Sequence, residues 1–552
     1  MGTAAATRWP RGDAPGVADG AQTPETMVSR RAGLGLLLLM LAGCAAPAAG
    51  GSSQPGPPQG VVVVTAGGTA LDSGADDVPP TLDLGLEGEG VTPAAVFVSL
   101  DGHRLTLASA KQGLTASVAP MAFASEHQLA IDVVGRAAQL IDFQVVDRTG
   151  VSAAAWLGAS GLLVCEVVFE RAPDRTAITA ALPQARLAWT DDTHLSLSWA
   201  SPPAALTIPA GLAASRGSVL DGPLQLSLRG LQAGQLRRAT VPAASPAPAG
   251  LRVTLWTDGT AASHASTQAH ATAAAILSPT GWQVEAGGGL SGSPDAVTLA
   301  AAAAAHRPVW PILANDDAGS TGTDQLLNSA TAETALIGAV VAQVRSLHLG
   351  GVNLDFESVP GNDQSALTAF AGRLSTALHA VGAGLSIDVV PHLARGANAA
   401  SAAYDDPALA AVADYLVVMA YDESTSPGAP GPVAGLDWQA AELAGTIAGI
   451  PAAKVVLGIP LYARRWSGEA VTAGAYASMV AQALAEPDVS YDYDFQAASP
   501  LLLSDPGGVP TQLWFDDADS LLRKIAAAGQ LGLAGVAAWV AGDEDPTFWS
   551  VI

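Results

Sequence analysis

The chain has 552 residues, of which 49% are hydrophobic and only 14% charged, so it is long enough for roughly two to four folded domains. Its 50 acidic and 25 basic residues give a net charge of −25, which opposes binding to nucleic acid or to an anionic lipid surface. The two cysteines, Cys44 and Cys165, are too few for a disulfide framework or a cysteine-based zinc site.

The segment Met27–Cys44 has the layout of an export signal. Arg30 and Arg31 precede the apolar run Ala32–Leu41, which is too short to span a bilayer, and the run ends in Leu-Ala-Gly-Cys. This segment resembles a bacterial lipoprotein signal. The resemblance implies a lipid on Cys44 and a protein held at the outer side of the membrane. The alternative is an ordinary secretion signal in which the cysteine occurs by chance.

Residues 1–44 are therefore interpreted as an upstream extension and a signal peptide, with Met1 and Met27 both remaining candidate starts. Residues 45–90 begin with an Ala/Gly/Ser/Pro-rich stretch and are predicted to form a flexible linker. This linker would connect the lipid anchor to the folded part of the chain.

Residues 91–240 contain short segments of alternating polarity, such as Ala95–Leu100, Leu162–Phe169 and Leu224–Leu228, separated by Asp-Gly turns. This pattern predicts one or two all-β sandwiches. Residues 162–229 also loosely resemble bacterial Ig-like repeats. Cys165 lies in an apolar strand and is expected to be buried. A spacer or wall-docking role is favoured over sugar binding, and residues 241–250 (VPAASPAPAG) are predicted to be a second linker.

From residue 251 to 552, strand-like segments alternate with longer helical ones, which is typical of a parallel α/β fold. The pattern predicts a (β/α)8 barrel. A doubly wound open sheet is the alternative, but no Gly-rich phosphate loop follows the first strand. The expected strands are Leu251–Trp256, Ala273–Leu277, Pro308–Ala314, Gly351–Glu357, Leu385–Val390, Tyr415–Tyr421, Lys454–Ile459 and Leu533–Trp539.

The fourth expected strand, Gly351–Glu357, carries the candidate chemistry. Because side chains alternate along a strand, Asn353, Asp355 and Glu357 should point into the barrel while the apolar residues between them face the helices. The active sites of such barrels lie at the carboxyl ends of the strands. Two carboxylates on one face repel each other, which raises the pKa of one of them and suits it to protonate a glycosidic oxygen.

The segment NLDFE (Asn353–Glu357) resembles the DxxDxDxE signature of family 18 glycoside hydrolases, the chitinase-like enzymes. The resemblance implies that Glu357 is the general acid and that Asp355 orients the 2-acetamido group of the substrate. The acetamido oxygen then attacks the anomeric carbon in place of an enzyme nucleophile. The signature's first Asp is replaced by Gly350 and its middle Asp by Asn353. Asn353 cannot share a proton with Asp355, but it can still hold that carboxylate by a hydrogen bond.

Further motifs occur in the order expected for this family. The MAYD motif at Met419–Asp422 implies that Tyr421 is catalytic and hydrogen-bonds the acetamido carbonyl. The same resemblance implies a sugar platform at Trp539. The form GVN-hydrophobe-DFE with MAYDE resembles the bacterial spore-germination, cortex-lytic branch, which acts on peptidoglycan. The predicted substrate-binding residues are Asn353, Met419, Asp422, Trp539, Tyr462 and Arg464.

The predicted function is therefore a glycosidase that cleaves β-1,4 linkages in polymers containing N-acetylglucosamine, with peptidoglycan favoured over chitin. The alternative is a weak or inactive glycan-binding envelope protein on the same barrel. Residues 467–511 are predicted to form a small α+β insertion before the last strand. No metal site or cofactor is expected, no nucleic acid is expected to bind, and the protein should be a monomer.

Overall fold

The computed structural model describes residues 63–552, except for 67–68, 80, 89–90, 112, 120, 135–137, 286, 392–401 and 427. Cys44 and the predicted export signal lie outside these residues. Among the residues that are described, no helix combines the length and the apolar character needed to cross a membrane.

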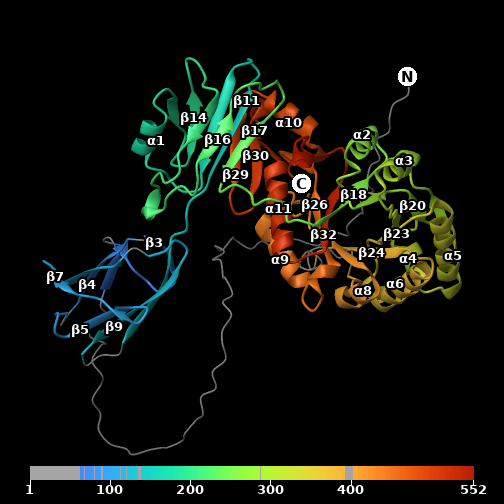
Figure 1. Ribbon diagram of the computed structural model, residues 1–552, viewed down its shortest axis with the longest axis horizontal. Coiled ribbons are helices and arrows are strands. Elements are labelled where there is room, and N and C mark those ends of the chain that lie inside the picture. The colour runs from blue at the N-terminus through green and yellow to red at the C-terminus, as the bar shows by residue number, and fades with distance from the viewer. Residues whose placement is uncertain are drawn as a thin grey trace, which may run out of the picture. The chain divides into compact units, whose positions relative to one another are not determined.

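The first described domain consists of two five-stranded sheets, ordered β2-β1-β4-β8-β7 and β3-β10-β9-β5-β6 (Figure 1). The prediction of a linker over residues 45–90 is wrong from Val63 onward, because β1 to β4 lie there. Leu84 and Leu86 alternate with exposed or half-buried residues and fill the core. Gly, Asp and Pro interrupt these short strands and give the sequence a linker-like composition. The strands are β1 (Val63–Ala66), β2 (Thr69–Ala70), β3 (Ala75–Val78), β4 (Asp83–Glu87), β5 (Val96–Leu100), β6 (His103–Arg104), β7 (Ala108–Ser109), β8 (Leu114–Ser117), β9 (Glu126–Val133) and β10 (Gln139–Val145).

A second β domain follows, with a five-stranded sheet ordered β13-β14-β12-β11-β17 and the two-stranded sheet β15-β16. Cys165 is 1% exposed in its core, as expected for a small apolar side chain. Val241 pairs with Val151 and ends a strand, so the linker predicted for 241–250 starts one residue too early. The elements are β11 (Val151–Leu157), β12 (Leu163–Phe169), α1 (Arg175–Ala181), β13 (Arg186–Trp189), β14 (His194–Ser198), β15 (Ala205–Ile208), β16 (Leu224–Ser227) and β17 (Arg237–Val241).

The C-terminal part of the described chain forms a barrel of parallel strands. Within one sheet the order is β19-β18-β32-β26-β25-β24-β23-β22, and a parallel bridge between Leu277 and Val309 closes the ring. A hairpin of β20 (Trp282–Val284) and β21 (Leu290–Gly292) extends the sheet beside β22. The barrel strands are β18 (Arg252–Thr257), β19 (Ile276–Pro279), β22 (Ile312–Ala314), β23 (Gly351–Asp355), β24 (Gly384–Val389), β25 (Tyr415–Val418), β26 (Val455–Pro460) and β32 (Gly535–Trp539).

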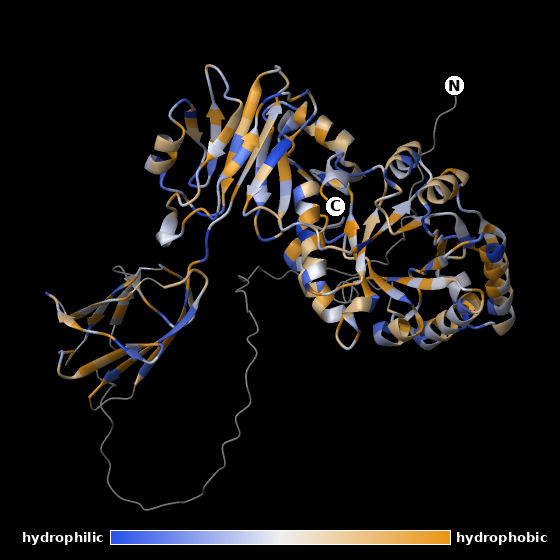
Figure 2. Cartoon of the chain, viewed as in Figure 1, coloured by the Kyte–Doolittle hydropathy of each residue, from blue (hydrophilic) through white to orange (hydrophobic). Residues whose placement is uncertain are grey.

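Helices surround the barrel strands (Figure 1). In Figure 2 the barrel strands are largely orange, whereas blue residues concentrate on the helices and loops. This is the distribution expected when the strands face the helix layer through apolar side chains. The helices are α2 (Ala261–His270), α3 (Ala296–Ala305), α4 (Gly319–Leu327), α5 (Ala330–Leu347), α6 (Gln364–His379), α8 (Asp406–Val412), α9 (Leu436–Thr446) and α11 (Ala518–Gln530).

Trp310 fills the barrel at the start of β23 and explains one departure from the signature. A Cβ atom at Gly351 would lie 2.5 Å from the Trp310 ring, and one at Gly350 would lie 2.7 Å from Pro308. Both distances are shorter than van der Waals contact. Gly350 therefore stands where this packing leaves no room for the first Asp of the signature.

The insertion before β32 is a five-stranded antiparallel sheet, ordered β28-β27-β31-β30-β29, with one helix. It begins at Tyr462 and ends at Trp514, so it is larger than the segment 467–511 expected from the sequence. Its elements are β27 (Tyr462–Ser467), β28 (Ala470–Ala475), α10 (Tyr476–Leu484), β29 (Ser490–Asp494), β30 (Ser499–Ser504) and β31 (Thr511–Trp514).

The second β domain and the insertion share one hydrophobic core. Trp156 of β11 is fully buried in a cluster with Tyr476, Val480 and Leu513 of the insertion. Beside this cluster, Ser152 and Tyr491 join their hydroxyl groups at 2.6 Å. The second β domain is therefore packed against the barrel through the insertion and is not a free module beside it.

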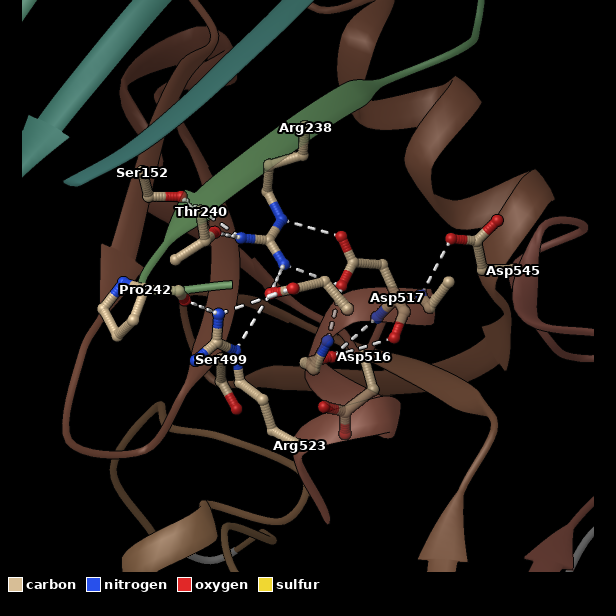
Figure 3. Close-up of polar contacts among 12 residues, drawn as sticks. Ser152, Arg238, Thr240, Pro242, Ser499, Asp516, Asp517, Arg523 and Asp545 are labelled. Carbon is tan, nitrogen blue, oxygen red and sulfur yellow. Dashed lines mark hydrogen bonds and ion pairs between the residues drawn. The ribbon is translucent and has the colours of Figure 1, made fainter. Parts of the chain in front are cut away.

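Arg238 of β17 adds a buried ion pair to this contact. Figure 3 shows its guanidinium group pointing at Asp517, with Ser152 and Thr240 on its other side. Arg238 is 3% exposed and Asp517 9% exposed at their side chains. A buried charge is costly unless an opposite charge lies beside it, and here Arg238 and Asp517 are each other's opposite charge.

Candidate functional site

Strand β23 places its polar residues inside the barrel, as the alternation predicted. Val352, Leu354 and Phe356 are buried in the layer between strands and helices, and Phe356 stacks on Phe370 of α6 with ring centroids 5.6 Å apart. Asn353 therefore points to the barrel interior, and Asp355 follows it toward the mouth. Glu357 comes two residues after β23 ends, at the carboxyl end of the barrel.

Asn353 binds different partners from those expected. Its side-chain amide donates to Asp388 Oδ1 of β24 at 2.7 Å, and its oxygen accepts from Trp256 Nε1 at 2.8 Å. The expectation that Asn353 holds Asp355 by a hydrogen bond is therefore wrong. The indole N–H of Trp256 is only a donor, so it fixes the amide orientation and directs the NH2 group toward Asp388.

The carboxyl group of Asp355 has one oxygen that makes no hydrogen bond. Its Oδ1 is buried and has no hydrogen-bond partner within the described part of the chain. Burial, together with the charges of Glu357, Asp388 and Asp316, raises the pKa of Asp355 well above its usual value. A buried carboxyl oxygen without a hydrogen-bond partner is uncommon in folded proteins and marks Asp355 as a candidate functional group.

Glu357 has the properties of a general acid. Burial, followed by repulsion from Asp316 and Asp422, raises its pKa to about 7. A carboxyl group with this pKa is partly protonated near neutral pH and can donate a proton to a leaving group.

The backbone around Glu357 is fixed from two sides. The side chain of Asn315, which is 3% exposed, donates to Glu357 O at 2.8 Å and accepts from Glu357 N at 2.9 Å. The hydroxyl of Tyr404 donates to Phe356 O at 2.9 Å. These three bonds restrict the backbone that carries the acid, although neither Asn315 nor Tyr404 was predicted to belong to the site.

Three of the predicted substrate-binding residues, Asp422, Tyr462 and Arg464, are joined by hydrogen bonds near Glu357. Asp422 accepts a short hydrogen bond from the hydroxyl of Tyr462 and another from Arg464 Nη2 at 2.5 Å. Arg464 also donates to Ser424 O at 2.6 Å. Tyr462 and Arg464 belong to β27, so the insertion contributes directly to the mouth of the barrel.

The remaining predicted residues lie in two environments. Tyr421 lies near the carboxyl groups of the site. Burial, together with the charges of Asp388, Asp355 and Glu357, raises the pKa of its hydroxyl well above the usual value. Trp539 ends β32 with its ring edge-on to Trp256, the centroids lying 5.8 Å apart. Met419, by contrast, is 9% exposed and belongs to the hydrophobic core.

Asp388 and Asp316 are titratable groups of the site that the sequence prediction omitted. Asp388 is 2% exposed, and burial followed by the charge of Glu357 raises its pKa to about 8 against the hydrogen bond from Asn353. Asp316 is exposed and follows β22. No cluster of His, Cys, Asp and Glu suited to a metal ion occurs in the ranges that the structure describes. The arrangement can donate a proton and hold a polar group of a substrate.

Comparison with known protein families gives a match over part of the chain. Residues 308–545 match the family described as glycosyl hydrolases family 18. The match starts before β22, whereas β18 and β19 precede it but belong to the same barrel.

Similar proteins include glycosylases and lytic enzymes of Bacillus. The chain is 31% identical to the "Putative sporulation-specific glycosylase YdhD" of Bacillus subtilis, over 42% of this chain and 58% of that protein. It is 27% identical to a cortical fragment-lytic enzyme of Bacillus anthracis, over 42% of this chain and 55% of that protein. The match thus spans little more than half the length of these relatives. Among solved structures, a chitinase of Chromobacterium violaceum is 25% identical with a TM-score of 0.51, covering 55% of this chain and 97% of that one.

Proposed function

We propose that this chain, whose residues 308–545 belong to glycosyl hydrolases family 18, cleaves β-1,4 linkages in polymers containing N-acetylglucosamine. The observation that carries the proposal is the position of Glu357. It is a half-buried carboxyl group with a pKa of about 7, at the carboxyl end of a barrel strand, and it lies near Asp355 and Tyr421. The mouths of such barrels are where catalytic groups gather.

In the proposed mechanism, Glu357 donates its proton to the oxygen of the leaving sugar. Asp355 and Tyr421 hold the 2-acetamido group so that its carbonyl oxygen attacks the anomeric carbon from the opposite face. Water then attacks the cyclic intermediate, and the Glu357 carboxylate takes the proton from that water. Two displacements at one carbon retain its configuration.

Peptidoglycan is the favoured polymer, and chitin is second. Similarity to a cortical fragment-lytic enzyme and to a sporulation-specific glycosylase supports this order. The export signal and Cys44 support placement outside the cytoplasm, with a lipid anchor in the membrane. In this arrangement a soluble body reaches a polymer that lies close to the membrane surface.

The test uses residues 63–552, purified and incubated with peptidoglycan, with N-acetylglucosamine oligomers, and with both polymers after chemical de-N-acetylation. Mass spectrometry identifies the released sugars. The proposal predicts products from an acetylated polymer and none from its de-N-acetylated counterpart, because the attacking oxygen is then missing. Equal cleavage of both forms would contradict the substrate-assisted mechanism.

A glycan-binding protein without hydrolytic activity is the second candidate function. The replacement of the signature's middle Asp by Asn353 favours it. This candidate predicts retention of the protein on one of the acetylated polymers with no release of sugar over the same incubation. Released sugar would contradict it.

A further inference from the structure

The chain leaves the barrel sheet in a tight turn after β25. The ladder between β25 and β26 ends at the pair Val418 and Leu457. Ala420 and Tyr421 then each donate their backbone N–H to the carbonyl oxygen two residues earlier, at 2.8 Å and 2.9 Å. Bonds of this kind turn the backbone tightly. The carbonyl group of Ala420 lies beyond the ladder, so a buried position for it requires a partner from another element.

Gln439 of α9 is the partner of Ala420 O. Its Nε2 donates to Ala420 O at 2.8 Å and lies 3.4 Å from Gly458 O of β26. Both neighbours are acceptors, so only the NH2 end of the amide can face them. Gln439 is 1% exposed, and its Oε1 is buried without a hydrogen-bond partner in the described part of the chain. An unpaired buried oxygen costs stability, which indicates that this side chain does more than fill space.

The ring of Tyr421 packs against bare backbone of β26. A Cβ atom at Gly458 would lie 3.0 Å from Tyr421 Cε1 and 2.7 Å from Val418 O. Both distances are shorter than ordinary van der Waals contact, so the glycine leaves the space that the ring and the turn occupy. Tyr421 is therefore confined by β26 on one side, while Gln439 holds the residue that precedes it.

A second attachment to α9 follows Asp422. Glu423 N donates to Val433 O at 3.0 Å, and Glu423 Oε2 accepts from Gly435 N at 2.6 Å. Gly435 is the N-cap of α9, so Glu423 satisfies one of the N–H groups that a helix leaves unpaired at this end. Asp422 has a left-handed φ of 64°, a conformation that a residue other than glycine keeps only when its surroundings hold it.

We propose that α9 holds the turn at Tyr421, and that Gln439 is a positioning residue that acts on Tyr421 through Ala420 O. This inference rests on the proposed function, in which Tyr421 holds the acetamido group of the substrate. The hydrogen bond fixes the peptide group that precedes Tyr421, and thereby the direction in which the tyrosine hydroxyl points. A displacement of about 1 Å at a group that contacts the substrate lowers a rate by about 10²-fold.

Gln439→Met tests the hydrogen bond, because methionine keeps the length of the side chain and removes the donor. We expect kcat to fall by about 10²-fold with KM nearly unchanged, since the other contacts to the polymer are kept. Thr446→Val is the matched control. Thr446 is also buried on α9, but its hydroxyl donates to Glu442 O within the helix, so this variant should keep the wild-type kcat.

The proposal is overturned if a folded Gln439→Met protein hydrolyses the polymer with the wild-type kcat. It is also overturned if Thr446→Val loses as much activity as Gln439→Met, because any change in the buried side of α9 would then have the same effect. A rise in KM without a fall in kcat would likewise contradict a role in positioning Tyr421.

Hydrogen–deuterium exchange separates this inference from the proposed function, because it needs no activity. We expect the amides of Ala420, Tyr421 and Glu423 to exchange faster in Gln439→Met than in the wild-type protein, and no faster in Thr446→Val. Unchanged exchange in Gln439→Met would refute the positioning role whether or not the protein cleaves a glycan. Faster exchange, together with no hydrolysis by the wild-type protein, would support the attachment of the turn to α9 and refute only the proposed function.

Discussion

Arg238 of the second β domain binds Asp517, the residue that caps the N-terminus of α11, through two hydrogen bonds of 2.7 Å. Burial works to raise the pKa of Asp517, but the charge and hydrogen bonds of Arg238 outweigh it and leave the pKa below its usual value. Helix α11 is followed by β32, which carries Trp539. A residue about 280 positions earlier in the chain thus stabilises the last unit of the barrel.

Replacing Arg238 by Leu should lower the free energy of unfolding by about 3–5 kcal/mol, because it leaves the Asp517 charge buried without a partner. Chemical denaturation measures this loss. Arg229→Leu, at an exposed arginine of the same domain, is the matched control and should change stability by less than about 0.5 kcal/mol. Equal stability of the two variants would argue against the ion pair as a stabilising contact.

Trp156→Ala should also destabilise the barrel, although Trp156 belongs to the β domain. Its side chain is fully buried against the insertion, so truncation leaves a cavity and costs about 3–5 kcal/mol. We expect the β domain and the barrel to unfold in one transition in the wild-type protein, as followed by calorimetry. Two well-separated transitions would show that the shared core does not couple the two domains.

The pH dependence of hydrolysis should follow Glu357. The acid works while protonated, so kcat/KM should fall as pH rises above about 7. Asp316→Asn removes a neighbouring negative charge, lowers the pKa of Glu357, and should move this alkaline limb to lower pH. Asp317→Asn, at the exposed adjacent position, should leave the limb in place. An alkaline limb unaffected by Asp316→Asn would mean that another group controls it.

The raised pKa of Glu357 also makes the stability of the fold depend on pH. Folding raises the pKa of Glu357 from 4.5, so the folded state binds this proton more tightly than the unfolded state does. The contribution of Glu357 to stability is therefore complete below pH 4.5 and is lost as the pH rises through about 7.

Asn315→Ala should lower kcat while leaving KM nearly unchanged. The variant loses both hydrogen bonds to the backbone of Glu357, and a small displacement of a catalytic group costs about 10²-fold in rate. Steady-state kinetics measure the effect, and Asn328→Ala, at an exposed residue that ends α4, is the control. An increase in KM alone would indicate that Asn315 helps to bind the substrate and does not position the acid.

The barrel could be predicted from the sequence because its strands and helices carry distinct patterns. Strand Gly351–Asp355 also revealed which residues face inward, since alternation is a local property. The first strands, from Val63 to Glu87, have the composition of a linker because glycines and prolines surround their few core residues. Strands this short cannot be recognised when composition is averaged over a long stretch of sequence.

Contacts between distant segments could not be predicted in the same way. Asn353 was expected to bind Asp355, its neighbour on one face, but it binds Asp388 on the next strand. The one feature of the sequence that pointed to Asp388 was its inward position in the alternating segment Leu385–Val390. Nothing in the local sequence of Arg238 indicates Asp517 as its partner, because that contact depends on how the β domain packs.

The most direct test of the proposed hydrolase is the initial rate of Glu357→Gln on the polymer that the wild-type protein cleaves. Glutamine preserves the shape of the side chain but cannot donate the proton. We expect the rate to fall by about 10²–10⁴-fold, with an unchanged circular dichroism spectrum. A folded Glu357→Gln protein that cleaves the polymer within about tenfold of the wild-type rate would contradict the assignment of Glu357 as the acid.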